Sequence, residues 1–424
     1  MTRNPFILIF VVVVGLLANR GVAQSPDPST LPRLEQADLV NVGGFKVPDT
    51  EANGHFNYGG GVMAFHPDGP SLLLTNWGRA AQITIPTPVL SGSISALPRA
   101  SYVKPFVVVL TAERAVGAGR VKADTLGGLL VHDGRLYGTA YVYYDGNNTQ
   151  ERSHFSHSLD LTDAASFRGW SQVWSAKSAG FVGGPMTPIP PEWQAKLGGT
   201  AITGLCCVPI VSRTSFGPAA FAFDPTKIGQ PKVPASPLVY YPSDHPNLGS
   251  WSGSNPIYGG TTLMGGSVIV PGTRTMLFFG SNGVGPNCYG LGTHNKAAHN
   301  PAKEICYDPV NPADEKGSHA YPYKYQVWAY DLNDLAAVKA GRKRPWDVKP
   351  YGVWPIDLPI THGFQVRFSS VAINPATGRI YAAQYKGEIH ADGGGQPVIW
   401  NFDPRIPAPT PKPGASGRDE TRDR

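Results

Sequence analysis

The sequence has little charge and only four cysteines. Charged residues make up 16% of its 424 residues, whereas 10% are aromatic. A disordered chain would carry more charge and fewer aromatic residues, so this composition excludes disorder over most of the chain. Glycine (50) and proline (41) are abundant instead. Frequent turn residues between aromatic-rich segments predict an all-β fold with many chain reversals.

Signatures of several common enzyme and partner classes are also missing. The sequence has no serine nucleophile elbow, no phosphate-binding glycine-rich loop between strand and helix, and no Cys-x-x-Cys-His haem motif. Its formal net charge of +6 is diffuse, and the one tight basic cluster, at 339–344, is typical of a solvated turn. We therefore expect no nucleic-acid partner. No later segment is apolar enough to span a membrane once the N-terminal stretch is removed.

The N-terminus has the three-part pattern of an export signal. Arg3 supplies the positive start, an apolar stretch runs from Phe6 to Ala18, and small residues end at Ala23. The apolar stretch is shorter than the ~20 residues that a bilayer span needs. We expect a signal peptide at 1–23 and a monomeric protein that is secreted or periplasmic. At the other end, 405–424 is rich in proline, glycine and charge and is expected to be a disordered tail.

The even number of cysteines in an exported chain favours disulfides over metal thiolates. Cys288 and Cys306 bracket a segment rich in glycine, asparagine and proline, and we favour their pairing because such a segment needs a covalent link. Cys206 and Cys207 would then form a vicinal disulfide or remain free thiols. Cross-links between the two pairs stay open, since the sequence does not choose among the pairings.

An apolar strand that ends in aspartate recurs along the chain. The strands end at Asp160, Asp224, Asp331 and Asp403, and a weaker copy has Pro86 in the equivalent place. The spacing is regular except before Asp331, where an insertion at about 281–325 accounts for the excess. Such self-similarity is the mark of a repeat fold.

Each of the five units also contains a hairpin and one further apolar segment. The hairpins begin at Val62, Leu129, Cys206, Ser267 and Ser370. The further segments begin at Gly43, Lys104, Trp170, Ser236 and Lys349. Four antiparallel strands in each of five units predict a five-bladed β-propeller over 43–404, after a lead-in at 24–42. A β-sandwich or an irregular β-rich enzyme is the alternative.

The repeat, with FNYGGGVMAF from Phe56 and KGSHAYPYKYQVWAYDL from Lys316, gives the chain the look of exported bacterial propellers without an assigned activity. It resembles the five-bladed β-propeller class, which includes exported glycan-cleaving enzymes and glycan-binding lectins. The resemblance implies that a glycosidase would carry three acidic residues on its innermost strands. We take the further apolar segments as the innermost strands, and they contain no aspartate or glutamate. This disfavours a glycosidase.

We expect the functional site on the face with long loops. Tight turns such as HPDG and NPATGR mark the opposite face. If the further apolar segment is the first strand of each unit, the long loops connect the first strand to the second and the third strand to the fourth. Long loops on a rigid scaffold commonly carry binding residues.

The insertion contributes the candidates for catalysis. His319, Tyr321 and Tyr323 could supply the base and acid of a polysaccharide lyase, with Arg367 neutralising a uronate carboxylate. In the competing interpretation the alternating tyrosines simply pack on one side of a strand.

Other loop residues are candidates for ligand or metal binding. The candidate ligand-binding residues are polar or aromatic: His55, Asn57, Tyr58, Trp251, Tyr258, His362 and Gln365. A calcium ion is the one cofactor that the sequence suggests, because oxygen-bearing side chains alternate as in calcium loops. These side chains belong to Asp145, Asn147, Thr149 and Glu151.

The leading interpretation is an exported propeller that binds an extracellular glycan or similar polymer on its loop-rich face. A polysaccharide lyase or glycoside hydrolase is the first alternative, and a protein-interaction scaffold is the second. Whether the protein is an enzyme stays open at this point.

Overall fold

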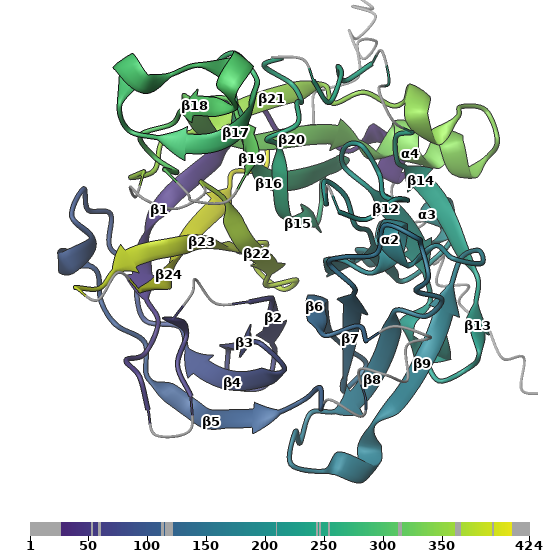
Figure 1. Cartoon of the computed structure of the whole chain (residues 1–424). Coiled ribbons are helices and arrows are strands. Elements are labelled where there is room, and N and C mark those ends of the chain that lie inside the picture. Colours follow the sequence, from purple (N-terminus) through teal and green to yellow (C-terminus); the bar gives the residue numbers. More distant parts are fainter. Residues whose placement is uncertain are drawn as a thin grey trace, which may run out of the picture.

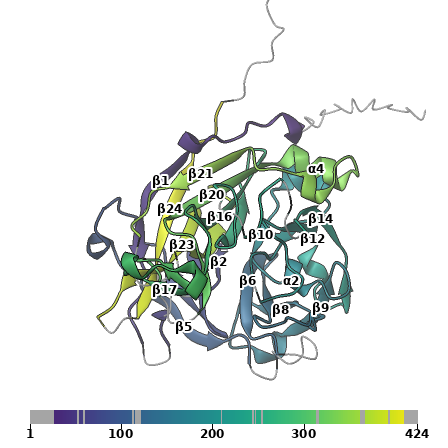
Figure 2. The ribbon, with the colours of Figure 1, turned by 45° about the horizontal axis from the view of Figure 1, so that its top comes forward.

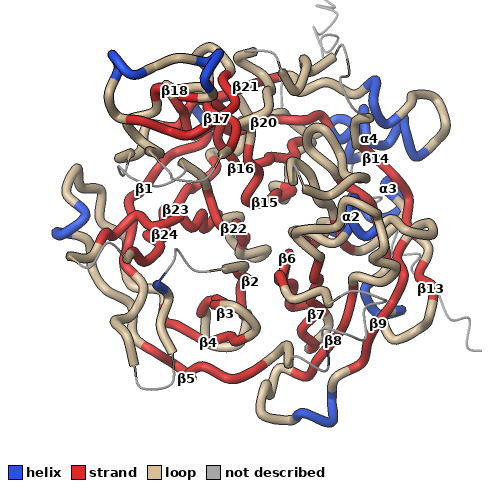
Figure 3. The backbone as a smooth tube through the Cα atoms, viewed as in Figure 1, coloured by secondary structure: helices blue, strands red, loops and turns tan. Residues whose placement is uncertain are grey.

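The structure is a computed structural model. It describes residues 27–51, 54–57, 61–111, 114, 122–208, 210–242, 245, 247–252, 255–312, 316–360, 366–391 and 394–408. The expected signal peptide and most of the expected tail lie outside these residues. Across the described ranges, no helix combines the length and the apolar character needed to cross a membrane. The chain is mostly β, and its few helices lie away from the centre (Figure 3).

Five antiparallel sheets contain most of the strands. The first comprises β2 (Met63–His66), β3 (Ser71–Asn76), β4 (Arg79–Thr84) and β5 (Tyr102–Val108). The second comprises β6 (Thr125–His132), β7 (Arg135–Tyr141), β8 (His154–Ser158) and β9 (Arg168–Val173), and β13 (Lys232–Val233) adds to β9 in parallel. The third comprises β10 (Met186–Pro188), β11 (Ala201–Thr203), β12 (Ala220–Phe223) and β14 (Ala235–Val239).

The fourth sheet comprises β15 (Leu263–Ile269), β16 (Thr275–Gly283), β20 (Tyr323–Asp331) and β21 (Gly352–Ile356). The fifth comprises β22 (Phe368–Ile373), β23 (Ile380–Ile389), β24 (Gly395–Pro404) and β1 (Leu39–Lys46). A smaller sheet of β17 (Cys288–Thr293), β18 (Ile305–Tyr307) and β19 (Gly317–His319) is inserted between β16 and β20. Where the structure describes the chain, the α-helices are α2 (Ala179–Val182), α3 (Pro191–Leu197) and α4 (Leu332–Lys339). Short 3-10 helices occupy Pro28–Thr30, Gln36–Asp38, Ile94–Ala96, Ala164–Ser166, Pro225–Lys227, Lys296–Ala298, Pro301–Lys303 and Pro345–Asp347.

The five sheets are grouped around their first strands (Figure 1). Strand β2 contacts β6 and β22, β10 contacts β6 and β15, and β15 contacts β22. The fifth sheet joins the two ends of the described chain, because β1 pairs antiparallel with β24 and places Phe45 opposite Ile399. None of the five first strands contains an acidic residue.

The aspartate-ended segments are third strands, whereas two other strand assignments from the sequence are wrong. The segments expected to be innermost form β1, β5, β9, β14 and β21, which are fourth strands at the periphery. Alternation marks a strand but not its place in a sheet, so the sequence misplaced them. The hairpin expected from Cys206 is also absent from the third sheet, where β10 and β11 pair instead and α3 lies between them.

The first strands all run in the same direction. The C-terminal ends of β2, β6, β10, β15 and β22 line one cavity. Their first-to-second connections therefore lie at this end, which we call the turn end. The second-to-third connections lie at the other end, which we call the loop face. They are 77–78, 142–153, 204–219, 284–322 and 390–394.

The sequence numbered the connections wrongly, since the observed first-to-second connections include the tight turns HPDG and NPATGR. Long connections occur at both ends, with 284–322 on the loop face and 332–351 at the turn end. In Figure 2 the inserted β17 and helix α4 lie toward opposite ends of the molecule. This agrees with their positions in a second-to-third and a third-to-fourth connection, respectively.

Buried aromatic side chains and their polar tips link neighbouring sheets. The Trp400 ring donates from Nε1 to Gln384 Oε1 at 2.7 Å, and Gln384 Nε2 donates to the Tyr325 hydroxyl at 2.9 Å. Trp400 and Tyr325 are each 2% exposed and belong to the fifth and fourth sheets. Burial of a large apolar side chain contributes ~1.5–3 kcal/mol, and the hydrogen bonds avoid the cost of unpaired polar tips.

Two disulfides are present. Cys288–Cys306 joins β17 to β18, which is the pairing favoured from the sequence. Cys206–Cys207 is a vicinal disulfide in the connection 204–219. The first closes the excursion between β16 and β20, and the second lies on the loop face.

Candidate functional site

His319, the central residue of the catalytic hypothesis, is buried inside the insertion. Its Nδ1 lies 2.8 Å from Asp308 Oδ2, and its Nε2 lies 3.2 Å from the Gly290 carbonyl oxygen. Its side chain is 2% exposed, and that of Asp308 is 0% exposed. Both ring nitrogens face hydrogen-bond acceptors, so neither offers a lone pair to a substrate. This arrangement suits a structural role better than proton transfer.

Tyr323 belongs to the same buried cluster. Its hydroxyl donates to Asp308 Oδ2 at 2.6 Å and accepts the Ala320 backbone N–H at 3.2 Å. Burial raises the pKa of Asp308, but hydrogen bonds from His319 and Tyr323 outweigh burial and leave the pKa lowered. Burial, then the charge of Asp308, raises the pKa of Tyr323. A phenol held so strongly in its neutral form is a poor general base.

Tyr321 packs among aromatic rings. Its ring centroid lies 5.6 Å from that of Tyr307 and 6.5 Å from that of Tyr323. These contacts agree with the packing interpretation of the alternating tyrosines.

Arg367 belongs to a different cluster, on the loop face. Its guanidinium carbon lies 3.9 Å from the centroid of Tyr385, and Lys386 Nζ lies 5.7 Å from the same centroid. Burial, then the charge of Arg367, lowers the pKa of Lys386. Burial raises the pKa of Tyr141 to about 12, and the charge of Arg367 opposes this shift. The structure therefore brings Arg367 together with Tyr141, Tyr385 and Lys386 instead of with His319.

Arg367 also has an unused donor. Its Nε is buried and has no hydrogen-bond partner among the described residues. The guanidinium and the Lys386 ammonium form a cationic group, which we call the cation pair. Adjacent cations of this kind favour a carboxylate or sulfate ligand.

His55 and Asn57 lie beside an aromatic hollow. The Asn57 backbone N–H donates to His55 Nδ1 at 3.2 Å, and Asn76 Nδ2 donates to the His55 carbonyl oxygen at 2.6 Å. His55, Asn76, Trp77 and Arg79 help to line a hollow of about 450 Å³. Asn57 Oδ1 accepts from Gln396 Nε2 at 3.5 Å.

The remaining candidate ligand-binding residues are buried, half-buried or outside the described residues. Tyr258 is 1% exposed and packs in the core, and Trp251 is half-buried with its ring 5.7 Å from that of Phe216. Tyr58, His362 and Gln365 lie outside the described residues.

The candidate calcium loop is closed by its own hydrogen bonds. Asp145 Oδ1 accepts from the backbone N–H and the hydroxyl of Thr149, both at 2.7 Å, and Oδ2 accepts from the Gln150 backbone N–H at 3.0 Å. Asn147 and Glu151 point outward as exposed side chains. In the described part of the chain, no group of three His, Cys, Asp or Glu side chains could hold a metal ion. The residues present do not fit a calcium ion, because the one buried carboxylate already accepts three hydrogen bonds and the candidate ligands Asn147 and Glu151 point away from it.

The exposed aromatic rings of the described residues lie on the loop face. Within the described ranges, the exposed aromatic side chains are Trp77 (74%), Tyr144 (74%), Tyr289 (59%) and Tyr143 (42%). All four lie in second-to-third connections, and the rings of Tyr143 and Tyr144 are 5.0 Å apart. None of these four residues was among the candidates predicted from the sequence. The signal that could have found them is an aromatic residue inside a turn, as in the pair Trp77-Gly78.

Comparisons with known proteins identify no family. No family model and no curated protein match the chain. Among solved structures, the chain is similar to a protein assigned as an oxidoreductase (glucose dehydrogenase) from Thermus thermophilus, with a TM-score of 0.32 and 11% identity over 86% of this chain and 99% of that one. It is also similar to a mutant of Trypanosoma rangeli sialidase displaying trans-sialidase activity, with a TM-score of 0.31 and 8% identity over 88% of this chain and 59% of that one. Both TM-scores are too low to decide the fold or the activity.

Proposed function

We propose that this protein is an exported, five-bladed β-propeller that binds an acidic extracellular glycan on its loop face. The observation that carries the proposal is that the exposed aromatic rings of the described residues all lie in second-to-third connections. Exposed rings cost free energy in water, and tyrosine and tryptophan faces stack on the apolar faces of sugars. Exposed rings in the connections of three different sheets suit an extended polymer better than a single small molecule.

The propeller assignment is supported by topology. Five sheets surround their contacting first strands, and the N-terminal β1 completes the sheet formed by the C-terminal β22, β23 and β24. Because β1 and β24 pair in the same sheet, the two ends of the described chain are held together and neither strand leaves that edge exposed. In this proposal residues 43–404 form the propeller, with 24–42 as lead-in and 405–424 as tail.

Export is supported by the N-terminal pattern at 1–23 and by the two disulfides. Disulfides persist in oxidising compartments and are rare in reducing ones. We place the mature protein outside the cell or in the periplasm, as a monomer.

The cation pair supports an acidic glycan. Arg367 and Lys386 repel one another, and Arg367 keeps a buried Nε donor without a partner among the described residues. A uronate carboxylate would accept from the guanidinium and relieve the repulsion at the same time. Tyr385 holds the guanidinium by a cation–π contact and so fixes its direction.

The test is retention of the purified mature protein on affinity gels that contain polygalacturonate, alginate, xylan or cellulose. We expect retention by an acidic polysaccharide, without release of unsaturated products or reducing ends. If none of the polysaccharide gels retards the protein, glycan binding is contradicted. Release of products would contradict binding as the whole function and would revive the lyase or hydrolase alternative.

A further inference from the structure

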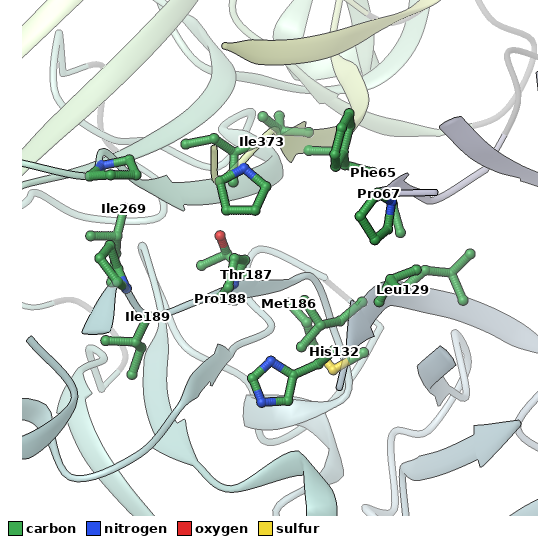
Figure 4. Close-up of a pocket in the computed structure, with 18 of the residues that line it drawn as sticks. Phe65, Pro67, Leu129, His132, Met186, Thr187, Pro188, Ile189, Ile269 and Ile373 are labelled. Atoms are coloured by element: carbon green, nitrogen blue, oxygen red, sulfur yellow. The ribbon is translucent and has the colours of Figure 1, made fainter. Parts of the chain in front are cut away.

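The turn end contains a second cavity that the glycan proposal does not use. It has a volume of about 290 Å³ and receives residues from the first strands of all five sheets (Figure 4). Its walls are mostly apolar, with Phe65, Met186, Ile189, Ile269 and Ile373 among them. Prolines contribute from four of the sheets: Pro67, Pro188, Pro190, Pro191, Pro271 and Pro375.

One polar atom inside this cavity has no partner. Thr187 lies on β10 and is 1% exposed, and its Oγ1 makes no hydrogen bond within the described part of the chain. In Figure 4 this oxygen points toward the middle of the cavity. A buried hydroxyl without a partner costs ~1–3 kcal/mol, and a valine of the same shape would avoid that cost. The hydroxyl can therefore pair with a polar atom of a molecule that enters the cavity.

The size of the cavity limits the partner. An engineered apolar cavity of ~150 Å³ in another protein holds one benzene molecule, so this cavity accommodates a body roughly twice that size. The ionisable residues on its lining are His132 and Asp133, whose Nε2 and Oδ2 atoms are 3.5 Å apart. Asp133 is exposed at the rim, so no charge lies deep in the cavity to pair with an ionic ligand.

We propose that this cavity is a binding site for a compact neutral molecule with an apolar body of about two fused rings and one hydroxyl or carbonyl oxygen. The apolar body fills the space between the first strands, and its oxygen pairs with Thr187 Oγ1. The site lies at the opposite end of the sheets from the exposed aromatic rings, so the two ligands do not compete.

The test uses 1-naphthol, which has one hydroxyl, and naphthalene, which has none. Both are titrated into the full mature protein by isothermal calorimetry. We expect saturable binding of one molecule of each, with 1-naphthol the tighter. T187V lowers the affinity for 1-naphthol about tenfold, as expected for the loss of one hydrogen bond to a buried group, and leaves naphthalene binding unchanged or tighter.

Two further variants keep the test decisive. I373F fills the cavity and abolishes binding of both probes, and I269F does the same from another wall if the first variant fails to fold. W77A, on the loop face, binds both probes like the wild type and so separates this site from the glycan site. No saturable binding of either probe, equal effects of T187V on both, or unchanged binding in a folded cavity-filling variant would overturn the proposal.

Discussion

The side chains of His319 and Asp308 form a buried pair, with Nδ1 and Oδ2 2.8 Å apart and neither group open to solvent. The pair lies inside the inserted sheet, and Tyr323 donates to the same carboxylate oxygen. A histidine that looked catalytic in the sequence therefore holds together the excursion between β16 and β20.

This role predicts that H319A destabilises the protein. Removing the ring leaves the buried Asp308 carboxylate without one of its hydrogen-bond partners, which typically costs ~1–3 kcal/mol. Urea unfolding should show this loss, and limited proteolysis should show faster cleavage within 284–322. A variant of normal stability that loses a polysaccharide-cleaving activity would show instead that His319 is catalytic.

A second buried histidine predicts acid sensitivity. Burial lowers the pKa of His154 from 6.5 to about 3. Its Nε2 lies 3.0 Å from Thr203 Oγ1 and its Nδ1 lies 2.9 Å from Ser153 Oγ, so the neutral ring is already paired. At a pH between these two pKa values, His154 is protonated in the unfolded chain but stays neutral in the folded protein. Stability therefore falls as the pH drops below about 6.5, by up to ~1.4 kcal/mol per pH unit from this residue.

H154Q provides the measurement for that effect, because glutamine keeps a donor and an acceptor but does not titrate. Urea unfolding between pH 7 and pH 4 should give a shallower loss of stability for H154Q than for the wild type. Parallel pH profiles would show that His154 is protonated in the folded protein.

The cation pair predicts a charge-specific defect. R367Q should bind an acidic glycan about tenfold more weakly, because one charged hydrogen bond is worth ~1.5 kcal/mol, and should bind neutral glycans unchanged. R405Q is the matched control, since Arg405 is exposed at the turn end and its loss changes the net charge equally. If R405Q weakens binding of the acidic glycan as much as R367Q does, the preference for acidic glycans comes from the net charge of the protein and not from Arg367.

The pKa of Lys386 predicts how this binding depends on pH. Burial and the charge of Arg367 lower that pKa, and a bound carboxylate favours the charged ammonium. Affinity for an acidic glycan should therefore fall as the pH rises through the lowered pKa. K386R should remove the fall, because arginine stays charged over that range. A fall of the same size in K386R would assign the titration to another group.

The sequence predicted some features well and others poorly, for physical reasons. Asp224 and Asp331 mark third strands because the apolar run before each is a strand whose end meets a polar turn. The order of strands within a sheet was not readable, because a fourth strand such as β21 (GVWPI) is as apolar as a first strand such as β22 (FSSVAI). In the third sheet the short β10 and β11 carry too few residues for an alternating pattern.

The candidate site was harder to predict than the fold. Burial of His319 depends on Asp308, which approaches only when the insertion folds, and burial of Tyr258 depends on packing between sheets. The exposure of Trp77 likewise follows from its position in the turn between β3 and β4. The burial of His319 and of Tyr258 has no local signal in the sequence, whereas the pair Trp77-Gly78 has one.

The most direct test of the central claim compares W77A with L90A on an affinity gel that contains the best-retained acidic glycan. Both side chains are highly exposed, 74% for Trp77 and 71% for Leu90, but Leu90 lies in the third-to-fourth connection between β4 and β5, beside Gly43 of β1. We expect W77A to lower the affinity about fivefold to tenfold, or ~1 kcal/mol or more, and L90A to behave like the wild type. Equal retention of W77A and the wild type, or an equal loss in L90A, would contradict glycan binding on the loop face.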